Sequence, residues 1–195
     1  MPVRGETAPE LTAVLEDAQR LGFLGSRPIP EVVEHARGFV RAIEHRASHG
    51  SVLDLGSGGG VPGLVIAHDL PATHVTLLDR RAKRTDALER FVRRLGWQER
   101  VSVVCADVSN FVQDASFDAV VARGFGPPAF TLSAAARLVR PGQVIVISEP
   151  PDGNRWEEEL LQRLGLRQIQ RADDTTGDRA APSSLDGLVA VFLKD

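Results

Sequence analysis

Apolar residues recur along this chain in two different spacings, and these spacings predict alternating helices and strands. Between residues 9 and 24 they stand three or four apart, and the same spacing returns after Pro30, so two amphipathic helices are expected first. Beyond them, short apolar runs predict strands and longer periodic segments predict helices. The predicted strands cover residues 52–55, 74–79, 101–105, 117–122, 143–147, 167–171 and 187–193, and the later helices cover residues 64–68, 81–95, 129–139 and 155–164.

Strands that alternate with helices predict an α/β fold with a doubly wound, mostly parallel seven-stranded sheet. No helix is predicted between the last two strands, so these are expected to pair antiparallel. The polar residues 172–186 between them predict a long loop. One domain over residues 1–195 is expected, with a helical segment (1–50) and an α/β core (51–195). The two early helices are expected to pack on the sheet, with a substrate-facing role as the alternative.

Composition excludes few functions. The chain has 195 residues and a net charge of −3, so a nucleic-acid site would have to be local. Cys105 is the single cysteine, which excludes an internal disulfide and fits a reducing compartment. We expect Cys105 to be a small buried residue at a strand end. Without an apolar signal core or membrane-length run, a cytoplasmic protein is predicted, with a monomer favoured.

The most informative stretch is the glycine-rich segment that follows the first predicted strand. Residues 51–63 read Ser-Val-Leu-Asp-Leu-Gly-Ser-Gly-Gly-Gly-Val-Pro-Gly. This order predicts a buried strand, a tight turn and then a helix with Pro62 in its first turn. Glycines would let a ligand approach the main chain, and free N–H groups at the helix start would form an anion site. A nucleotide-type cofactor loop is therefore expected.

Three aspartates sharpen the choice of cofactor. Asp54, Asp79 and Asp107 all fall at the ends of predicted parallel strands, where open α/β sheets bind their ligands. A carboxylate at position 79 can accept hydrogen bonds from ribose hydroxyls. Residues 58–63 also match the dinucleotide fingerprint, but Asp54 stands where those sites usually carry an apolar residue. Alternatively, each aspartate only caps a turn or a helix.

Residues 54–63 resemble motif I of S-adenosylmethionine-dependent methyltransferases. The Gly-Gly-Gly-x-Pro-Gly form is similar to the glucose-inhibited division protein B family, whose members methylate N7 of a guanine in 16S ribosomal RNA. The similarity continues through residues 75–79, 83–84, 106–107 and 117–125. It implies S-adenosyl-L-methionine as cofactor, and ribosomal RNA or the small ribosomal subunit as partner.

The resemblance also assigns roles to residues. It implies that Gly56 and Val61 contact the cofactor, that Ala106 and Asp107 lie near adenine, and that Arg123 lines the active site beside cofactor and substrate. The expected cofactor site is Asp54, Gly56, Ser57, Gly58, Gly60, Val61, Asp79, Arg80, Ala106, Asp107 and Arg123, and the expected substrate contacts are Arg84, Arg123 and Phe125. No catalytic residue is expected, because the lone pair of guanine N7 needs no general base.

Several alternatives stay open. Members of the family usually carry Lys-Gly after the fifth strand and a longer N-terminal region, whereas this chain has Glu149 there and 50 residues before the motif. These differences favour a small-metabolite methyltransferase; an NAD-dependent oxidoreductase and a non-catalytic binding module are more remote. Lys83, Arg90, Arg93 and Arg94 predict an exposed basic face that either contacts phosphates or is only solvated. His45 and His49 lack a third ligand, so no metal site is expected.

Overall fold

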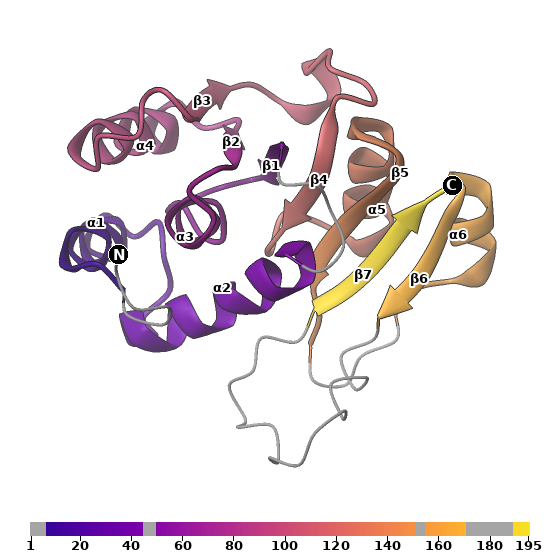
Figure 1. Ribbon diagram of the computed structural model, residues 1–195, viewed down its shortest axis with the longest axis horizontal. Coiled ribbons are helices and arrows are strands. Elements are labelled where there is room, and N and C mark those ends of the chain that lie inside the picture. Colours follow the sequence, from indigo (N-terminus) through magenta and orange to yellow (C-terminus); the bar gives the residue numbers. More distant parts are fainter. Residues whose placement is uncertain (1–6, 45–49, 151–154, 171–188) are drawn as a thin grey trace.

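The structure is a computed structural model that describes residues 7–44, 50–150, 155–170 and 189–195. Its centre is a seven-stranded sheet with the strand order β3-β2-β1-β4-β5-β7-β6 (Figure 1). The strands are β1 (Ser51–Leu55), β2 (His74–Asp79), β3 (Val101–Cys105), β4 (Phe117–Ala122), β5 (Val139–Ser148), β6 (Leu166–Gln170) and β7 (Val189–Lys194). The first five run parallel, and β7 pairs antiparallel with both β5 and β6. The predicted fold class and the antiparallel pair are confirmed.

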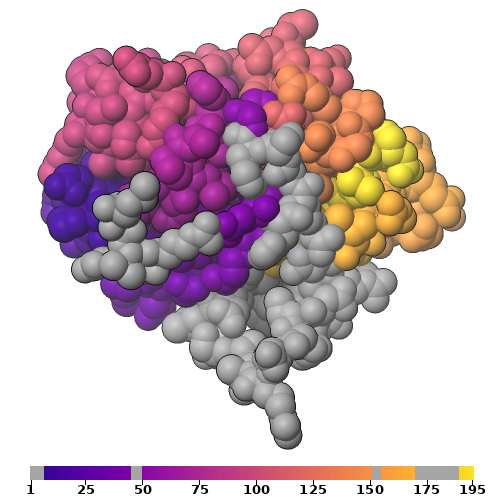
Figure 2. Space-filling view, in the orientation of Figure 1, coloured from indigo at the N-terminus to yellow at the C-terminus, as the bar shows by residue number. Residues whose placement is uncertain are grey.

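Helices cover both faces of the sheet (Figure 1). One face carries α2 (Ile29–Glu44), α3 (Gly63–Asp69) and α4 (Ala82–Arg94), and α1 (Pro9–Arg20) packs against α2 and α3. The other face carries α5 (Pro128–Leu138) and α6 (Glu158–Leu164), and the short 3₁₀ helix η1 (Val108–Asn110) joins that layer. In the space-filling view, α1 and α4 lie on one side of the molecule and β6, β7 and α6 on the other (Figure 2).

The strands divide their side chains between two cores because successive residues of a strand point to opposite faces. On β1, Val52 packs with the layer of α1 to α4, whereas Leu53 and Leu55 pack with α5 and α6. Asp54 therefore shares the face of Val52 and lies toward α3. Burial of these strands on both sides explains their nearly continuous apolar sequence.

Some expectations need correction. β5 begins at Val139 rather than at residue 143, because Val139 already pairs with Phe117 before a register shift. The helix expected from residue 155 begins at Glu158. Cys105 is exposed, not buried, because β3 is an edge strand of the sheet. The predicted loop 172–186 and both His45 and His49 lie outside the described residues.

No helix in the described ranges has the length and apolar character that a membrane span requires.

Two glycines of the turn between β1 and α3, Gly60 and Gly63, leave no room for additional side-chain atoms. A Cβ atom on Gly63 would clash with Leu77 and would stand 2.7 Å from a carboxylate oxygen of Asp54. At Gly60, where φ is +92°, a Cβ atom would clash with Leu64. These spaces are filled by the chain's own side chains, so these glycines are required by packing and not by the approach of a ligand.

We expect Gly63→Ala to lower the free energy of unfolding by about 1–3 kcal/mol, because overpacking forces Leu77 or the Asp54 carboxylate to move. Urea denaturation of the purified variant measures this loss. The matched control is Gly25→Ala, because a Cβ atom there would meet nothing within 4 Å. It should change stability by less than about 0.5 kcal/mol. Equal stability of the two variants would contradict the packing argument.

Candidate functional site

Segments that follow four neighbouring parallel strands meet around one cavity of about 380 Å³. Its lining comprises Gly56, residues 78–81, Arg84, residues 106–108, residues 124–127 and Phe130. These segments come from the carboxyl ends of β1, β2, β3 and β4, and the strand order reverses between β1 and β4. This is the position at which open α/β sheets bind ligands, and the volume lies in the usual range for small-molecule sites.

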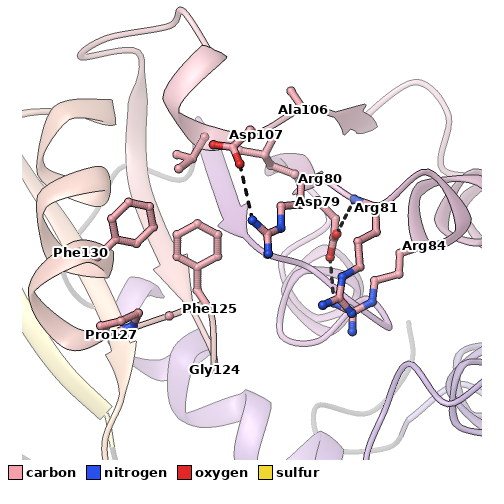
Figure 3. Close-up of a pocket in the computed structure, with 14 residues that line it drawn as sticks. Asp79, Arg80, Arg81, Arg84, Ala106, Asp107, Gly124, Phe125, Pro127 and Phe130 are labelled. Carbon is pink, nitrogen blue, oxygen red and sulfur yellow. Dashed lines mark hydrogen bonds and ion pairs between the residues drawn. The ribbon is translucent and has the colours of Figure 1, made fainter.

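Asp79 ends β2 and has a buried carboxylate on the cavity (Figure 3). Its Oδ1 accepts a hydrogen bond from the backbone N–H of Arg81 (2.9 Å), and its Oδ2 accepts one from that of Gly58 (3.0 Å). The guanidinium of Arg84 lies 3.3 Å from Oδ2. These donors fix the carboxylate, and Oδ1 keeps a lone pair that another donor can use.

Asp107 follows β3 and also lines the cavity. Its Oδ1 accepts hydrogen bonds from the backbone N–H (3.0 Å) and the hydroxyl (2.7 Å) of Ser109, so it caps η1. These two bonds, with a smaller contribution from Arg80, hold the pKa of Asp107 below its usual value. Arg80 Nη1 lies 3.8 Å from Oδ2 in a solvent-exposed pair that contributes little to stability.

Two aromatic rings stand across the cavity from Asp79 (Figure 3). The rings of Phe125 and Phe130 stack at 5.8 Å with an interplanar angle of 19°. Phe130 is 51% exposed, so it is not a core residue. A Cβ atom on Gly56 would stand 2.5 Å from Phe125, so this glycine makes room for the ring. The cavity thus has an aromatic wall that faces a wall of paired aspartate and arginine side chains.

The structure separates Asp54 from the other two aspartates. Its side chain is 1% exposed and does not line the cavity. Oδ2 accepts a hydrogen bond from the backbone N–H of Gly63 (3.0 Å), the first residue of α3. Oδ1 is buried and has no hydrogen-bond partner among the described residues. Burial raises the pKa of Asp54 to about 7, although the Gly63 bond acts against the shift.

The expectation of an anion site at the start of α3 is wrong. Asp54 already takes the N–H of Gly63, and Gly60 O accepts from the N–H of Leu64. The N–H groups of Gly56 and Ser57 both donate to the carbonyl of Leu78. Ser57, Gly58, Gly60 and Val61 are buried in this turn and do not line the cavity. The turn therefore supports the site, and Gly56 is the part of it that reaches the surface of the cavity.

Arg123 lies at two neighbouring cavities, of about 330 and 210 Å³, and not at the first. His35 of α2 lines both as well, so an early helix contributes to this edge of the sheet. Sequence analysis missed His35 and Glu31. They stand one helical turn apart on α2, but Glu34 is polar as well, so no sequence signal marks them.

The remaining basic candidates lie apart from the cavities. Lys83, Arg90, Arg93 and Arg94 are exposed on α4, and Arg94 pairs with Asp17 at 2.8 Å.

Trp156 is buried, packs edge-on against Phe192 and donates to Glu149 Oε1 at 2.7 Å. Within the described ranges, no three His, Cys, Asp or Glu residues are placed to hold a metal.

Comparison with known proteins identifies the family. The profile described as rRNA small subunit methyltransferase G (GidB) matches residues 11–175. The chain belongs to the GidB family. A GidB relative from Thermotoga neapolitana, a ribosomal RNA small subunit methyltransferase G, is 32% identical over 70% of this chain and 62% of its own length. A relative of the same name from Hyphomonas neptunium is 30% identical over 81% of this chain and 76% of its own.

Several GidB relatives are longer than the part that matches. The similarity covers 62% of the Thermotoga neapolitana protein and 51% of the one from Parasynechococcus marenigrum. The chain therefore spans about half to two thirds of the length of these relatives.

Solved structures confirm the GidB chain's methyltransferase-like fold. A putative O-methyltransferase from Klebsiella pneumoniae superposes with a TM-score of 0.65 over 98% of this chain and 92% of its own, at 16% identity. An S-adenosylmethionine-dependent O-methyltransferase from Thermotoga maritima gives a TM-score of 0.60 over 93% and 71%, at 13% identity.

Asp54 makes stability depend on pH. Because its folded pKa of about 7 exceeds the ordinary value of 3.8, its contribution is fully present below about pH 4 and is lost as the pH rises through 7. We expect the free energy of unfolding of the wild type, relative to Asp54→Asn, to fall by about 2 to 3 kcal/mol between pH 5 and pH 8. Urea denaturation at four pH values measures the difference.

Asp86→Asn, at an exposed position on α4, is the control and should follow the wild type at every pH. A constant difference between the wild type and Asp54→Asn would show that Asp54 does not titrate in this range.

Proposed function

We propose that this chain is an S-adenosylmethionine-dependent methyltransferase that acts on N7 of a guanine in 16S ribosomal RNA. The observation that carries the proposal is the cavity at the ends of β1 to β4, with Asp79 at the end of β2, in a chain of the GidB family. The names of the curated relatives support a substrate in small-subunit RNA.

The residues around the cavity fit an adenosyl group. Asp79 offers a fixed carboxylate oxygen to the ribose hydroxyls, since its backbone donors leave that lone pair available. Ala106 and Val108 give an apolar floor beside Asp107, and Phe125 closes the opposite side. When bound, S-adenosylmethionine supplies a methyl group that is already activated as a sulfonium.

The chain's own contribution to methyl transfer is to bind and orient the reactants and to exclude water. Guanine N7 carries a free lone pair, so no side chain has to remove a proton before the transfer. Asp54 acts indirectly, because it fixes α3 to β1 and so holds the turn that carries Gly56. We therefore assign no catalytic acid or base.

A small-metabolite methyltransferase is the second candidate. It is favoured by Glu149, a buried carboxylate beside the cavity of about 330 Å³. Its Oε1 lies 3.3 Å from the guanidinium of Arg155 and accepts a bond from Trp156. A fixed carboxylate could select a cationic or hydrogen-bond-donating small substrate.

Asp79→Asn should weaken binding of S-adenosylhomocysteine about tenfold or more, because an amide replaces one of the two oxygens that anchor donors. Isothermal titration calorimetry measures the affinity, and a urea curve on the same sample shows whether the variant is folded. Asp86→Asn, on the exposed side of α4, is the matched control and should bind like the wild type. Absence of binding by the folded wild type would refute the cofactor assignment.

Deletion of the gene should remove one methylguanosine from 16S RNA, and mass analysis of nuclease fragments would detect the loss. The wild-type gene should restore the modification, whereas the Asp79→Asn gene should restore much less, since the cofactor binds more weakly. An unchanged methylation pattern in the deletion strain would contradict the RNA substrate and favour the small-metabolite alternative.

A further inference from the structure

One large aromatic side chain stands exposed beside the cavity proposed for the cofactor. Phe130 is 51% exposed, and the other exposed large hydrophobic residues in the described ranges are Leu21 and Val112. Neither Leu21 nor Val112 lines any of the three cavities described above. Single exposed apolar side chains are common on protein surfaces, but an exposed ring that lines a cavity is a candidate contact for a ligand.

The start of α5 holds Phe130 on a regular turn of helix. α5 begins at Pro128, and Phe130 is its third residue. Proline is favoured at this position because its fixed φ angle already suits a helix. The N–H of Thr131 donates to the carbonyl of Pro127 (2.9 Å), which closes the first turn around Phe130. A ligand that packs on the ring therefore does not have to order the backbone that carries it.

Phe125 stands between Phe130 and the opposite wall of the cavity. Figure 3 shows the ring of Phe125 between that of Phe130 and the side chain of Arg80. The centroids of the two rings lie 5.8 Å apart, so Phe125 covers part of one face of Phe130. A cofactor whose ribose is held by Asp79 therefore meets Phe125 before it meets Phe130.

Phe130 also lies beside the boundary between two cavities. It lines the one of about 380 Å³, whereas Pro128 and Thr131, on the same turn of α5, line the one of about 330 Å³. Phe125 and Gly126 line both cavities. A ligand on the ring of Phe130 is thus next to the cofactor cavity and next to a second space that is large enough for a nucleobase.

The surroundings of the ring suit a nucleic acid better than an apolar protein segment. Unpaired RNA bases have two flat faces, and proteins that bind single-stranded RNA stack such bases on aromatic side chains. The lining of the larger cavity has three arginines and two aspartates, so a polyanion is not repelled there. An apolar protein partner would have to cover these charged groups, and their desolvation is costly.

We propose that Phe130 is a stacking platform for an unpaired nucleobase of the RNA substrate. The proposal rests on the RNA substrate proposed above, and it adds a residue of α5 to the expected substrate contacts. Stacking on Phe130 holds the RNA strand beside the cavity that carries Asp79. The platform does not select a particular base, because every base has a π face.

The adenine of the cofactor is also a flat base, so it is the other possible source of a ring stacked on Phe130. Two observations favour the RNA. Ala106 and Asp107, which are expected near adenine, lie across the cavity from Phe130 (Figure 3). Phe125 is the aromatic ring on the side of that wall, and its own stack with Phe130 leaves it in place to meet the cofactor.

The test uses the full chain with Phe130→Ala and Phe130→Leu. Leu21→Ala is the matched control, because Leu21 is 49% exposed and lies away from the cavities. The RNA probes are unmodified 16S RNA transcript, small ribosomal subunits and a short, fully paired RNA duplex, and their affinities are measured at several salt concentrations. S-adenosylhomocysteine is the cofactor probe, and its binding is measured by isothermal titration calorimetry.

Phe130→Ala should weaken binding of the transcript about five- to hundredfold, as expected for the loss of one stacked base. The slope of log affinity against log salt should not change, because a phenyl ring releases no counterions. Phe130→Leu should lose most of the same affinity, since leucine keeps apolar area but has no flat ring. Binding of the duplex and of S-adenosylhomocysteine should stay as in the wild type, and Leu21→Ala should keep every affinity.

Wild-type affinity for the transcript in Phe130→Ala or in Phe130→Leu would overturn the stacking platform and leave the RNA substrate in place. An equal loss of S-adenosylhomocysteine binding would overturn it in favour of adenine. A loss with small subunits but not with the transcript would overturn it in favour of a ribosomal protein. A wild type that binds S-adenosylhomocysteine but neither transcript nor subunits would overturn the RNA substrate and the platform together. A wild type that binds no S-adenosylhomocysteine would overturn the cofactor assignment, and the RNA titrations would still decide the platform.

Discussion

The hydrogen bond between the carboxylate of Asp54 and the N–H of Gly63 holds the functional edge of this protein in place. It joins the end of β1 to the first residue of α3, so a side chain of the sheet serves as the hydrogen-bond acceptor at that helix start. The intervening turn is fastened to β2 through the carbonyl of Leu78 and the carboxylate of Asp79. These contacts within the protein hold Gly56 at the cavity.

A second consequence concerns charge along the carboxyl edge. The cavity that carries Asp79 and Asp107 is also lined by three arginines, Arg80, Arg81 and Arg84. Arg84 pairs with Asp79, and Arg80 lies 3.8 Å from Asp107, so opposite charges meet within the cavity. The net charge of −3 therefore says little about this edge, because opposite charges cancel locally as well as in the total.

The sequence predicted the strands and their mostly parallel direction. It also predicted that Asp79 and Asp107 lie at strand ends, because an apolar run ends directly before or at each of them. The face on which the Asp54 side chain lies could also have been predicted. It stands two residues after Val52 on the same strand, so both side chains point toward the layer of α3. The contribution of His35 could not be predicted, because packing decides which polar residue of α2 reaches the edge of the sheet. Cys105 is exposed because β3 lies at the edge of the sheet. The order of the strands along the chain does not predict which of them lies at an edge.

Glycine spacing alone says little about which cofactor this turn serves. Leucine side chains fill the space that the missing Cβ atoms of these glycines leave: Leu24 at Gly59, Leu64 at Gly60 and Leu77 at Gly63. The glycine spacing therefore reflects how the turn packs against its neighbours. A dinucleotide site with equally close packing would need the same glycines. What distinguishes this chain from a dinucleotide site is a buried carboxylate at position 54, which accepts a hydrogen bond from the helix start. The residue before the turn must therefore be considered together with the glycines when the cofactor is predicted.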